Sequence, residues 1–143
     1  MCEMSLTATA QSTTGSLRQD VVVGGRFRLA TDEPERLGGS DSAPSPHELI
    51  PAALASCVST TLLMYARTKG WELGELEVEV DYDHRSAPRV CTIVVRTSAT
   101  VTSEQAARLV KVAASCPVRR ALEGGVVFSE HIETAVPELR LAG

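Results

Sequence analysis

Cys116 occupies a position at which a thiol could become a nucleophile. It directly precedes Pro117 and a predicted short helix over 117–122. At such a helix start the sulfur would face free backbone amides and the positive end of the helix dipole, and both lower a thiol pKa. Arg119 and Arg120 follow within one turn and would favour the charged form further. The sequence therefore gives Cys116 a route to the thiolate, which is the reactive form of cysteine.

The chain has three other cysteines among its four. Cys57 lies in the middle of an apolar stretch, where a free cysteine is either a small core residue or a reactive thiol, and the pattern leaves both open. Cys91 alternates in phase with Ile93 and Val95, which predicts a core residue. Cys2, near the terminus, is expected to be unreactive. There is no C-x-x-C pair, and the histidines lie outside ligand spacing, so we expect no metal site and no thioredoxin-like motif.

Composition limits the class of protein that holds these thiols. The 143 residues are 43% hydrophobic and 22% charged, as in one globular domain, here assigned to 1–143. A net charge of −4 and 3% aromatic residues argue against nucleic-acid binding. The opening residues 1–4 lack the basic region and apolar run of a signal peptide. We therefore expect a cytoplasmic protein, whose thiols start reduced.

A long helix is the strongest predicted element. Ser45 is a good N-cap, Pro46 suits the first helical position, and Glu48 completes a capping box. Residues 49–66 carry no charge and approach membrane-spanning length. Because they include a proline and several hydroxyl residues, we predict a helix buried on all sides of a globular domain rather than a membrane span. Gly70 is a natural C-terminal cap, so the helix is expected to end there.

The remaining patterns predict strands on either side of this helix and two shorter helices after them. Period-two alternation and Gly-Gly turns indicate strands, and the spacing of small apolar residues indicates an amphipathic helix capped by Thr102 and Gln105. The expected fold class is therefore α+β, with antiparallel strands packed on a central helix. The predicted strands cover 5–14, 21–23, 26–29, 75–82, 89–101 and 126–128, and the predicted helices cover 46–70, 103–115 and 117–122.

Two separated motifs together resemble the OsmC/Ohr family, which contains osmotically induced protein C and the organic hydroperoxide resistance proteins. The first runs from Leu37-Gly38-Gly39 through Pro46-His47-Glu48-Leu49 to Cys57, and the second is Cys116-Pro117-Val118. The resemblance covers nearly the whole chain. It implies an OsmC-like fold, with curved antiparallel sheets around a long buried central helix. It also implies an intertwined homodimer with its sites at the subunit interface.

The resemblance further implies a chemistry. Members of the family reduce hydroperoxides through a peroxidatic cysteine, which becomes a sulfenic acid, and a resolving cysteine, which condenses with it to a disulfide. Cys57 matches the first position and Cys116 the second. The chain would then be a cysteine-based organic hydroperoxidase acting in oxidative-stress defence. It would need no bound cofactor and would use an external dithiol as reductant.

The supporting residues of the family match less completely. Arg36 aligns with the arginine that holds the thiolate if one loop residue is gapped, and Arg18 and Arg26 are weaker candidates. The glutamate that orients this arginine is replaced by His47, and Glu48 is already explained by helix capping. His47 and Cys57 would be separated by about 15 Å along one helix. If both act in one site, one of them must come from a second subunit.

Two other interpretations remain. The chain could be a non-enzymatic OsmC-like dimer that binds a small apolar ligand at its subunit interface, or a dimer whose thiols only pack. The peroxidase interpretation predicts that Cys57 is mostly buried beside a guanidinium, that of Arg36 first, because a buried thiol without a cation is inert. Expected partners are a second copy, a hydroperoxide and a dithiol, with neither nucleic acid nor membrane.

Overall fold

The computed structural model describes residues 5–135. The described chain forms two compact units, one from 5–49 and 129–135 and the other from 50–128, and each is described by itself. The prediction of one domain over 1–143 stays a prediction. Cys2 lies outside the described residues.

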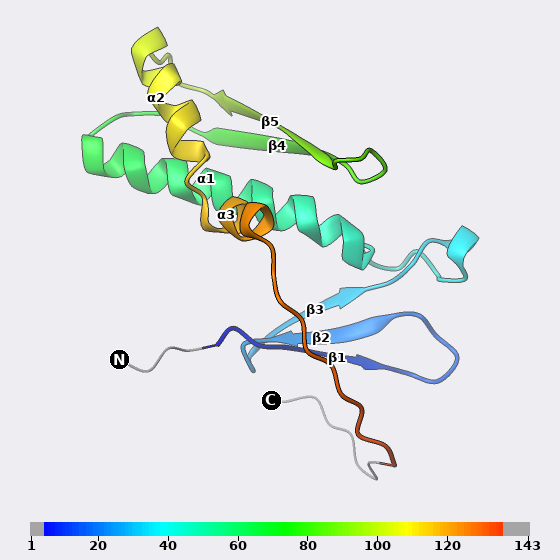
Figure 1. Ribbon diagram of the computed structural model, residues 1–143. Helices are drawn as coiled ribbons and strands as arrows, with labels where there is room; N and C mark the ends of the chain where they lie inside the picture. The colour runs from blue at the N-terminus through cyan, green and yellow to red at the C-terminus, as the bar shows by residue number, and fades with distance from the viewer. Residues whose placement is uncertain (1–4, 136–143) are drawn as a thin grey trace. The chain divides into compact units, whose positions relative to one another are not determined.

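The first unit is built on a three-stranded antiparallel sheet in the order β1-β2-β3 (Figure 1). Its strands are β1 (Ala8–Ser12), β2 (Gln19–Val23) and β3 (Phe27–Thr31). In the turn between β2 and β3, Gly24 and Gly25 have φ values of 61° and 72°, which only glycine adopts without strain. This confirms the predicted hairpin and the predicted strand before it.

The long helix α1 (Leu49–Lys69) follows a 3₁₀ turn, η2 (Pro46–Glu48). The predicted cap is present, because the amide and hydroxyl of Ser45 donate to Glu48 Oε1 at 3.0 and 2.9 Å. The helix ends at Gly70, where φ is 69°. Both predicted ends of the helix are therefore confirmed.

Only one stripe of α1 is buried within the chain, which corrects the expectation of burial on all sides. The stripe has a spacing of four residues and consists of Leu54, Val58, Leu62 and Ala66. Leu63 and Met64, on another face, are 42% and 63% exposed, since no described element of the second unit packs over them. By length and composition, Pro46–Lys69 could cross a membrane, but the core helix of a globular protein passes the same test.

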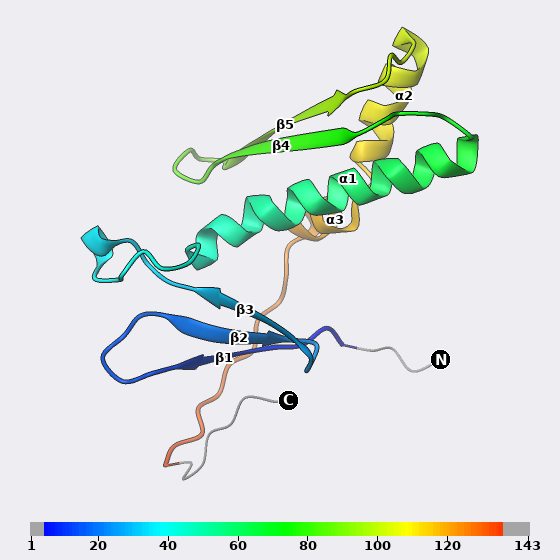
Figure 2. The same cartoon turned by 180° about the vertical axis from the view of Figure 1, so that it is seen from behind.

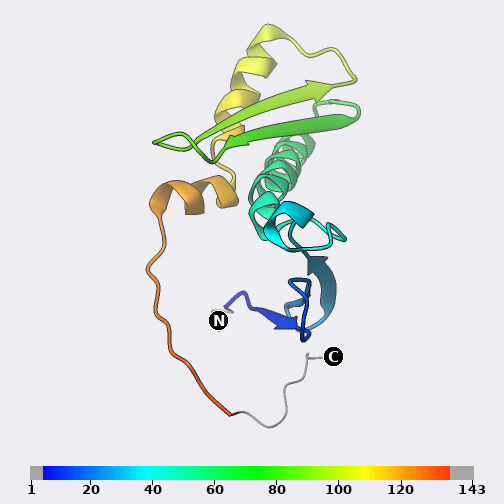
Figure 3. The same ribbon diagram turned by 90° about the vertical axis from the view of Figure 1, so that its right-hand side faces the viewer.

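The second unit packs a β-hairpin and two short helices against α1 (Figure 2). The hairpin pairs β4 (Leu76–Asp83) with β5 (Val90–Thr97) in antiparallel register, and its apolar side chains alternate toward the core. After it come α2 (Ser103–Ala113) and α3 (Pro117–Gly124), which Figure 3 shows from the side. Thr102 and Gln105 cap α2 reciprocally, as predicted, at 2.9 and 3.0 Å.

A polar and aromatic contact ties α2 to the C-terminal end of α1. Arg108 Nε donates to the Tyr65 hydroxyl at 2.9 Å, and the Tyr65 and Trp71 rings meet edge to face at 5.6 Å. Leu109 and Ala113 continue the contact by packing on the buried stripe of α1. The docking of α2 therefore fixes where the chain turns into α3, and with it the position of Cys116.

Two local predictions are wrong. Val126–Phe128 form no strand: no described strand pairs with them, and Val127 is 97% exposed. A β-prone tripeptide without a ladder partner stays irregular. Cys91 lies on the same side of β5 as Ile93, as its phase requires, but it is exposed rather than in the core. Cys91 pairs with Tyr82 at the end of the hairpin next to the connecting turn, where its side chain stays exposed.

Candidate thiol site

The structure brings together two cysteines that are far apart in sequence. Cys57 comes from the middle of α1, and Cys116 is the N-cap residue of α3, with Pro117 at the first helical position. The Cys116 thiol donates a hydrogen bond to the Cys57 sulfur. Cys57 is partly exposed, whereas Cys116 is 0% exposed and belongs to the hydrophobic core. Of these two thiols, only Cys57 is therefore open to a reagent in solution.

Hydrogen bonds hold the pKa of Cys57 below its ordinary value. Burial alone would raise this pKa, but three donors outweigh it: the Cys116 thiol, the Val118 amide and the Thr61 hydroxyl. Val118 is the second residue of α3, so its amide has no partner inside the helix. The helix N-terminus thus helps to stabilise the thiolate of Cys57, a residue of another helix.

The pKa of Cys116 is shifted in the opposite direction. Burial raises it, and so does the hydrogen bond in which its thiol is the donor to Cys57; the amides of Arg119 and Val118 only partly compensate. The expectation that Cys116 is partly thiolate is therefore wrong. The helix-start argument identified the right amides, but a buried thiol that donates its proton to a neighbouring sulfur keeps that proton.

Thr61 is a contributor that the sequence analysis missed. It lies four residues after Cys57 on α1, so both side chains share one face of the helix. Its hydroxyl is one of the donors that lower the Cys57 pKa. The spacing of a hydroxyl residue four positions from a candidate nucleophile was the signal available in the sequence.

The predicted supporting residues lie in the other unit. Arg36 is in the 3₁₀ turn η1 (Glu35–Leu37), and its pairing with Cys57 stays a prediction. His47 lies in η2, next to Glu48, whose carboxylate caps the helix as expected. The weaker candidates have partners in their own unit: Arg18 donates to Ser42 Oγ at 2.7 Å, and the Arg26 guanidinium lies 4.6 Å from the centre of the Phe27 ring.

A buried carboxylate organises the loop that carries Arg36. Asp32 is 1% exposed and accepts hydrogen bonds from the Ser42 hydroxyl at 2.7 Å and from the amides of Glu33, Ser40 and Ser42. The Ser42 hydroxyl, followed by these amides, lowers the pKa of Asp32 to about 2. Asp32 therefore anchors both ends of the segment 33–42, and η1 lies between them.

This geometry can perform two-electron thiol chemistry. A partly exposed sulfur with a lowered pKa is a nucleophile, and a second sulfur within hydrogen-bond contact can displace a leaving group from the first. Among residues 5–135, no cluster of three or more His, Cys, Asp or Glu side chains could hold a metal ion.

Comparison with solved structures shows the same fold in bacterial proteins. An OsmC-like protein from Mycoplasma pneumoniae matches with a TM-score of 0.69 at 15% identity, covering 86% of this chain and 90% of that one. An organic hydroperoxide resistance protein from Elizabethkingia anophelis, with thiocyanate bound, matches with 0.62 at 24% identity, covering 86% and 91%. A Vibrio cholerae protein assigned to organic hydroperoxide resistance, with captopril bound in one of its active sites, matches with 0.64 at 25% identity, covering 87% and 88%.

The sequence itself also identifies the family. No curated protein matches the chain at a significant level. The family model described as OsmC-like protein matches residues 39–131, which include α1, both cysteines of the site and α3. The α+β fold predicted from the resemblance is confirmed by the solved structures. The chain therefore belongs to the OsmC-like protein family.

Proposed function

We propose that this protein is a thiol-dependent peroxidase that reduces organic hydroperoxides and thereby contributes to peroxide resistance. The observation that carries the proposal is the hydrogen-bonded pair of Cys57 and Cys116, whose pKa values are shifted in opposite directions. Structural neighbours named as organic hydroperoxide resistance proteins support the substrate class. In this assignment Cys57 is the peroxidatic cysteine and Cys116 the resolving one.

In the first step the Cys57 thiolate attacks the distal oxygen of the hydroperoxide. The O–O bond breaks, an S–O bond forms, and the alkoxide leaves and is protonated to the alcohol. Cys57 is then a sulfenic acid. Because Cys57 is the partly exposed thiol and has the lowered pKa, it is the sulfur that a hydroperoxide can reach in its reactive form.

In the second step Cys116 attacks the sulfur of the Cys57 sulfenic acid. The S–O bond breaks, a disulfide forms, and hydroxide takes up the Cys116 proton and leaves as water. The raised pKa of Cys116 keeps this thiol protonated until Cys57 has been oxidised. An external dithiol then supplies two electrons and two protons, which return both cysteines to thiols.

Further parts of the proposal concern residues and partners beyond the thiol pair. Arg36 is proposed to stabilise the Cys57 thiolate, with His47 in the position where relatives use a glutamate. The protein is proposed to act in the cytoplasm as a homodimer, in which the exposed Leu63 and Met64 of α1 would be covered by the second copy. No bound cofactor is assigned.

The test is consumption of cumene hydroperoxide with dithiothreitol or dihydrolipoamide as reductant. Cys57→Ser should abolish turnover, and Cys116→Ser should allow one oxidation event without efficient recycling. Cys91→Ser, which removes an exposed thiol outside the pair, is the matched control and should turn over like the wild type. Turnover that survives Cys57→Ser would contradict the proposal.

A further inference from the structure

Two adjoining cavities lie in the second unit, on the side of α1 that faces the hairpin. One has a volume of about 400 Å³ and runs along β5 to α2; we call it the aliphatic cavity. The other, the arginine cavity, has a volume of about 560 Å³ and lies between β5, the start of α1 and α3. They share three lining residues, Cys91, Ile93 and Arg119, so one wall belongs to both. Both volumes are in the range of small-molecule sites.

The aliphatic cavity has walls suited to a hydrocarbon chain. Among the described residues that line it, none is aromatic. The walls are formed chiefly by branched aliphatic side chains of α1, β5, α2 and the loop between β5 and α2: Leu62, Ile93, Val95, Val101, Leu109 and Val110. Close-packed protein interiors leave few voids larger than a water molecule. An apolar occupant would recover the contacts that these side chains lack within the chain.

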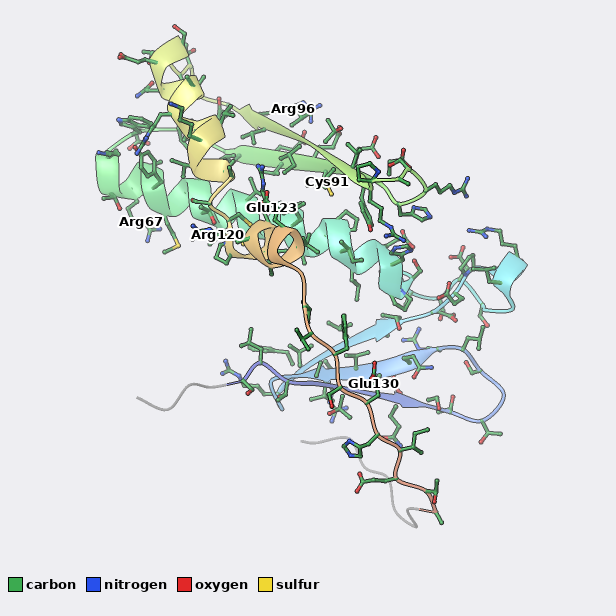
Figure 4. The ribbon with its side chains drawn as sticks, viewed as in Figure 1. Arg67, Cys91, Arg96, Arg120, Glu123 and Glu130 are labelled. Atoms are coloured by element: carbon green, nitrogen blue, oxygen red, sulfur yellow. The ribbon has the colours of Figure 1, made fainter. Side chains whose placement is uncertain are left out.

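The junction of the two cavities is cationic. Arg119 lines both cavities, and Arg89 lines the arginine cavity. Glu123 supplies the one carboxylate among the described residues that line the arginine cavity. Arg119 Nε pairs with Glu123 at 2.6 Å, but both side chains are substantially exposed, so this ion pair is easily exchanged. Figure 4 shows the two elements that line the junction, with Cys91 on β5 and Glu123 on α3.

We propose that these cavities bind one molecule with an unbranched hydrocarbon chain and a carboxylate head. The chain occupies the aliphatic cavity, and the carboxylate pairs with Arg119. Arginine matches a carboxylate with two parallel hydrogen bonds, which a neutral head group cannot equal. The aliphatic cavity has no aromatic residue among its described lining residues, which favours a flexible chain there over a flat ring system. This site goes beyond the peroxidase proposal and does not depend on the thiol chemistry.

The binding test uses the fluorescent polyene carboxylate cis-parinarate, displaced by myristate, on the intact protein. We expect one probe per chain. Arg119→Gln should raise the Kd about tenfold or more, since a charge-assisted pair is lost. The matched control Arg120→Gln changes the neighbouring residue, which lines neither cavity, and should stay within about twofold. Glu123→Gln should bind more tightly, because Arg119 loses its competing partner.

The location is tested separately through Cys91, which lies in the shared wall. Saturating myristate should slow alkylation of Cys91 by iodoacetamide at least about fivefold, measured by peptide mapping, while methyl myristate at the same concentration should not. Equal losses in Arg119→Gln and Arg120→Gln, or a Glu123→Gln variant that fails to bind more tightly, would overturn the head-group assignment. One probe per two chains, or an unprotected Cys91, would overturn the location. Neither measurement involves a hydroperoxide. A negative result in either one therefore leaves the test of the peroxidase proposal unaffected.

Discussion

Replacing Thr61 with valine should make Cys57 less reactive without changing the shape of α1. Threonine and valine side chains are nearly isosteric, and the substitution removes only the hydroxyl that donates to the Cys57 sulfur. Losing one such hydrogen bond costs about 1 kcal/mol. This cost is smaller than for most charged acceptors, because sulfur accepts hydrogen bonds weakly. That corresponds to about a fivefold fall in the ratio of thiolate to thiol at neutral pH.

The assay is the pH dependence of Cys57 alkylation by iodoacetamide, followed by peptide mapping so that Cys91 and Cys116 are counted separately. The pKa of Cys57 should be higher in Thr61→Val than in the wild type. The rate near pH 7 should fall about fivefold, while the plateau rate at high pH stays the same because both proteins are then fully thiolate.

Thr60→Val is the control, since Thr60 precedes Thr61 on α1 but is exposed and is not among the donors to Cys57. Its profile should match that of the wild type. Identical profiles for Thr61→Val and the wild type would refute the argument that hydrogen bonds set the reactivity of Cys57. Equal changes in the two threonine variants would refute it too, by attributing the effect to the helix in general.

Three further predictions concern the thiol pair, the loop and the assembly. After one equivalent of cumene hydroperoxide, peptide mapping should find a Cys57–Cys116 disulfide. In Cys116→Ala, Cys57 should instead be oxidised to sulfinic acid. Sulfinic acid at Cys57 of the wild-type protein would exclude Cys116 as the resolving cysteine. The lowered pKa of Asp32 means that its contribution to stability is complete above the ordinary carboxyl pKa of about 4 and is lost as pH falls toward 2. The Tm difference between wild type and Asp32→Asn should therefore be largest near pH 7 and narrow below about pH 4, whereas a constant difference would contradict this account. In dilute solution the protein should have twice the mass of the 15.2 kDa chain, as sedimentation can measure, and a stable monomer would contradict the proposed dimer.

Local signals in the sequence were sufficient for most elements. The capping pairs Ser45–Glu48 and Thr102–Gln105 place the starts of two helices, because each pair satisfies amides that the helix leaves free. Strict alternation over Leu76–Asp83 and the Gly24-Gly25 turn fix two hairpins in the same local way. The motif spacing around Cys57 and Cys116 identified the family, which then supplied the fold.

Properties that depend on distant neighbours were not predictable in this way. The packing of α3 on α1 brings the Val118 amide to Cys57 and makes Cys116 a buried donor, and the sequence alone therefore assigned the lowered pKa to Cys116 instead of Cys57. The exposure of Cys91 depends on what covers the end of β5, and its phase in the strand gives only its side. Whether Val126–Phe128 form a strand likewise depends on a pairing partner, which β-propensity cannot provide.

The hydrogen bond from the Val118 amide to Cys57 also links the oxidation state of the site to the backbone. As long as Cys57 is a thiolate, a negative charge holds the first turn of α3, where Pro117 lacks an amide of its own. Disulfide formation removes that charge, and the Val118 amide proton then faces a neutral sulfur, which is a weaker acceptor than a thiolate. Its exchange with solvent deuterium should then accelerate, so that one amide proton reports whether the protein has met its oxidant.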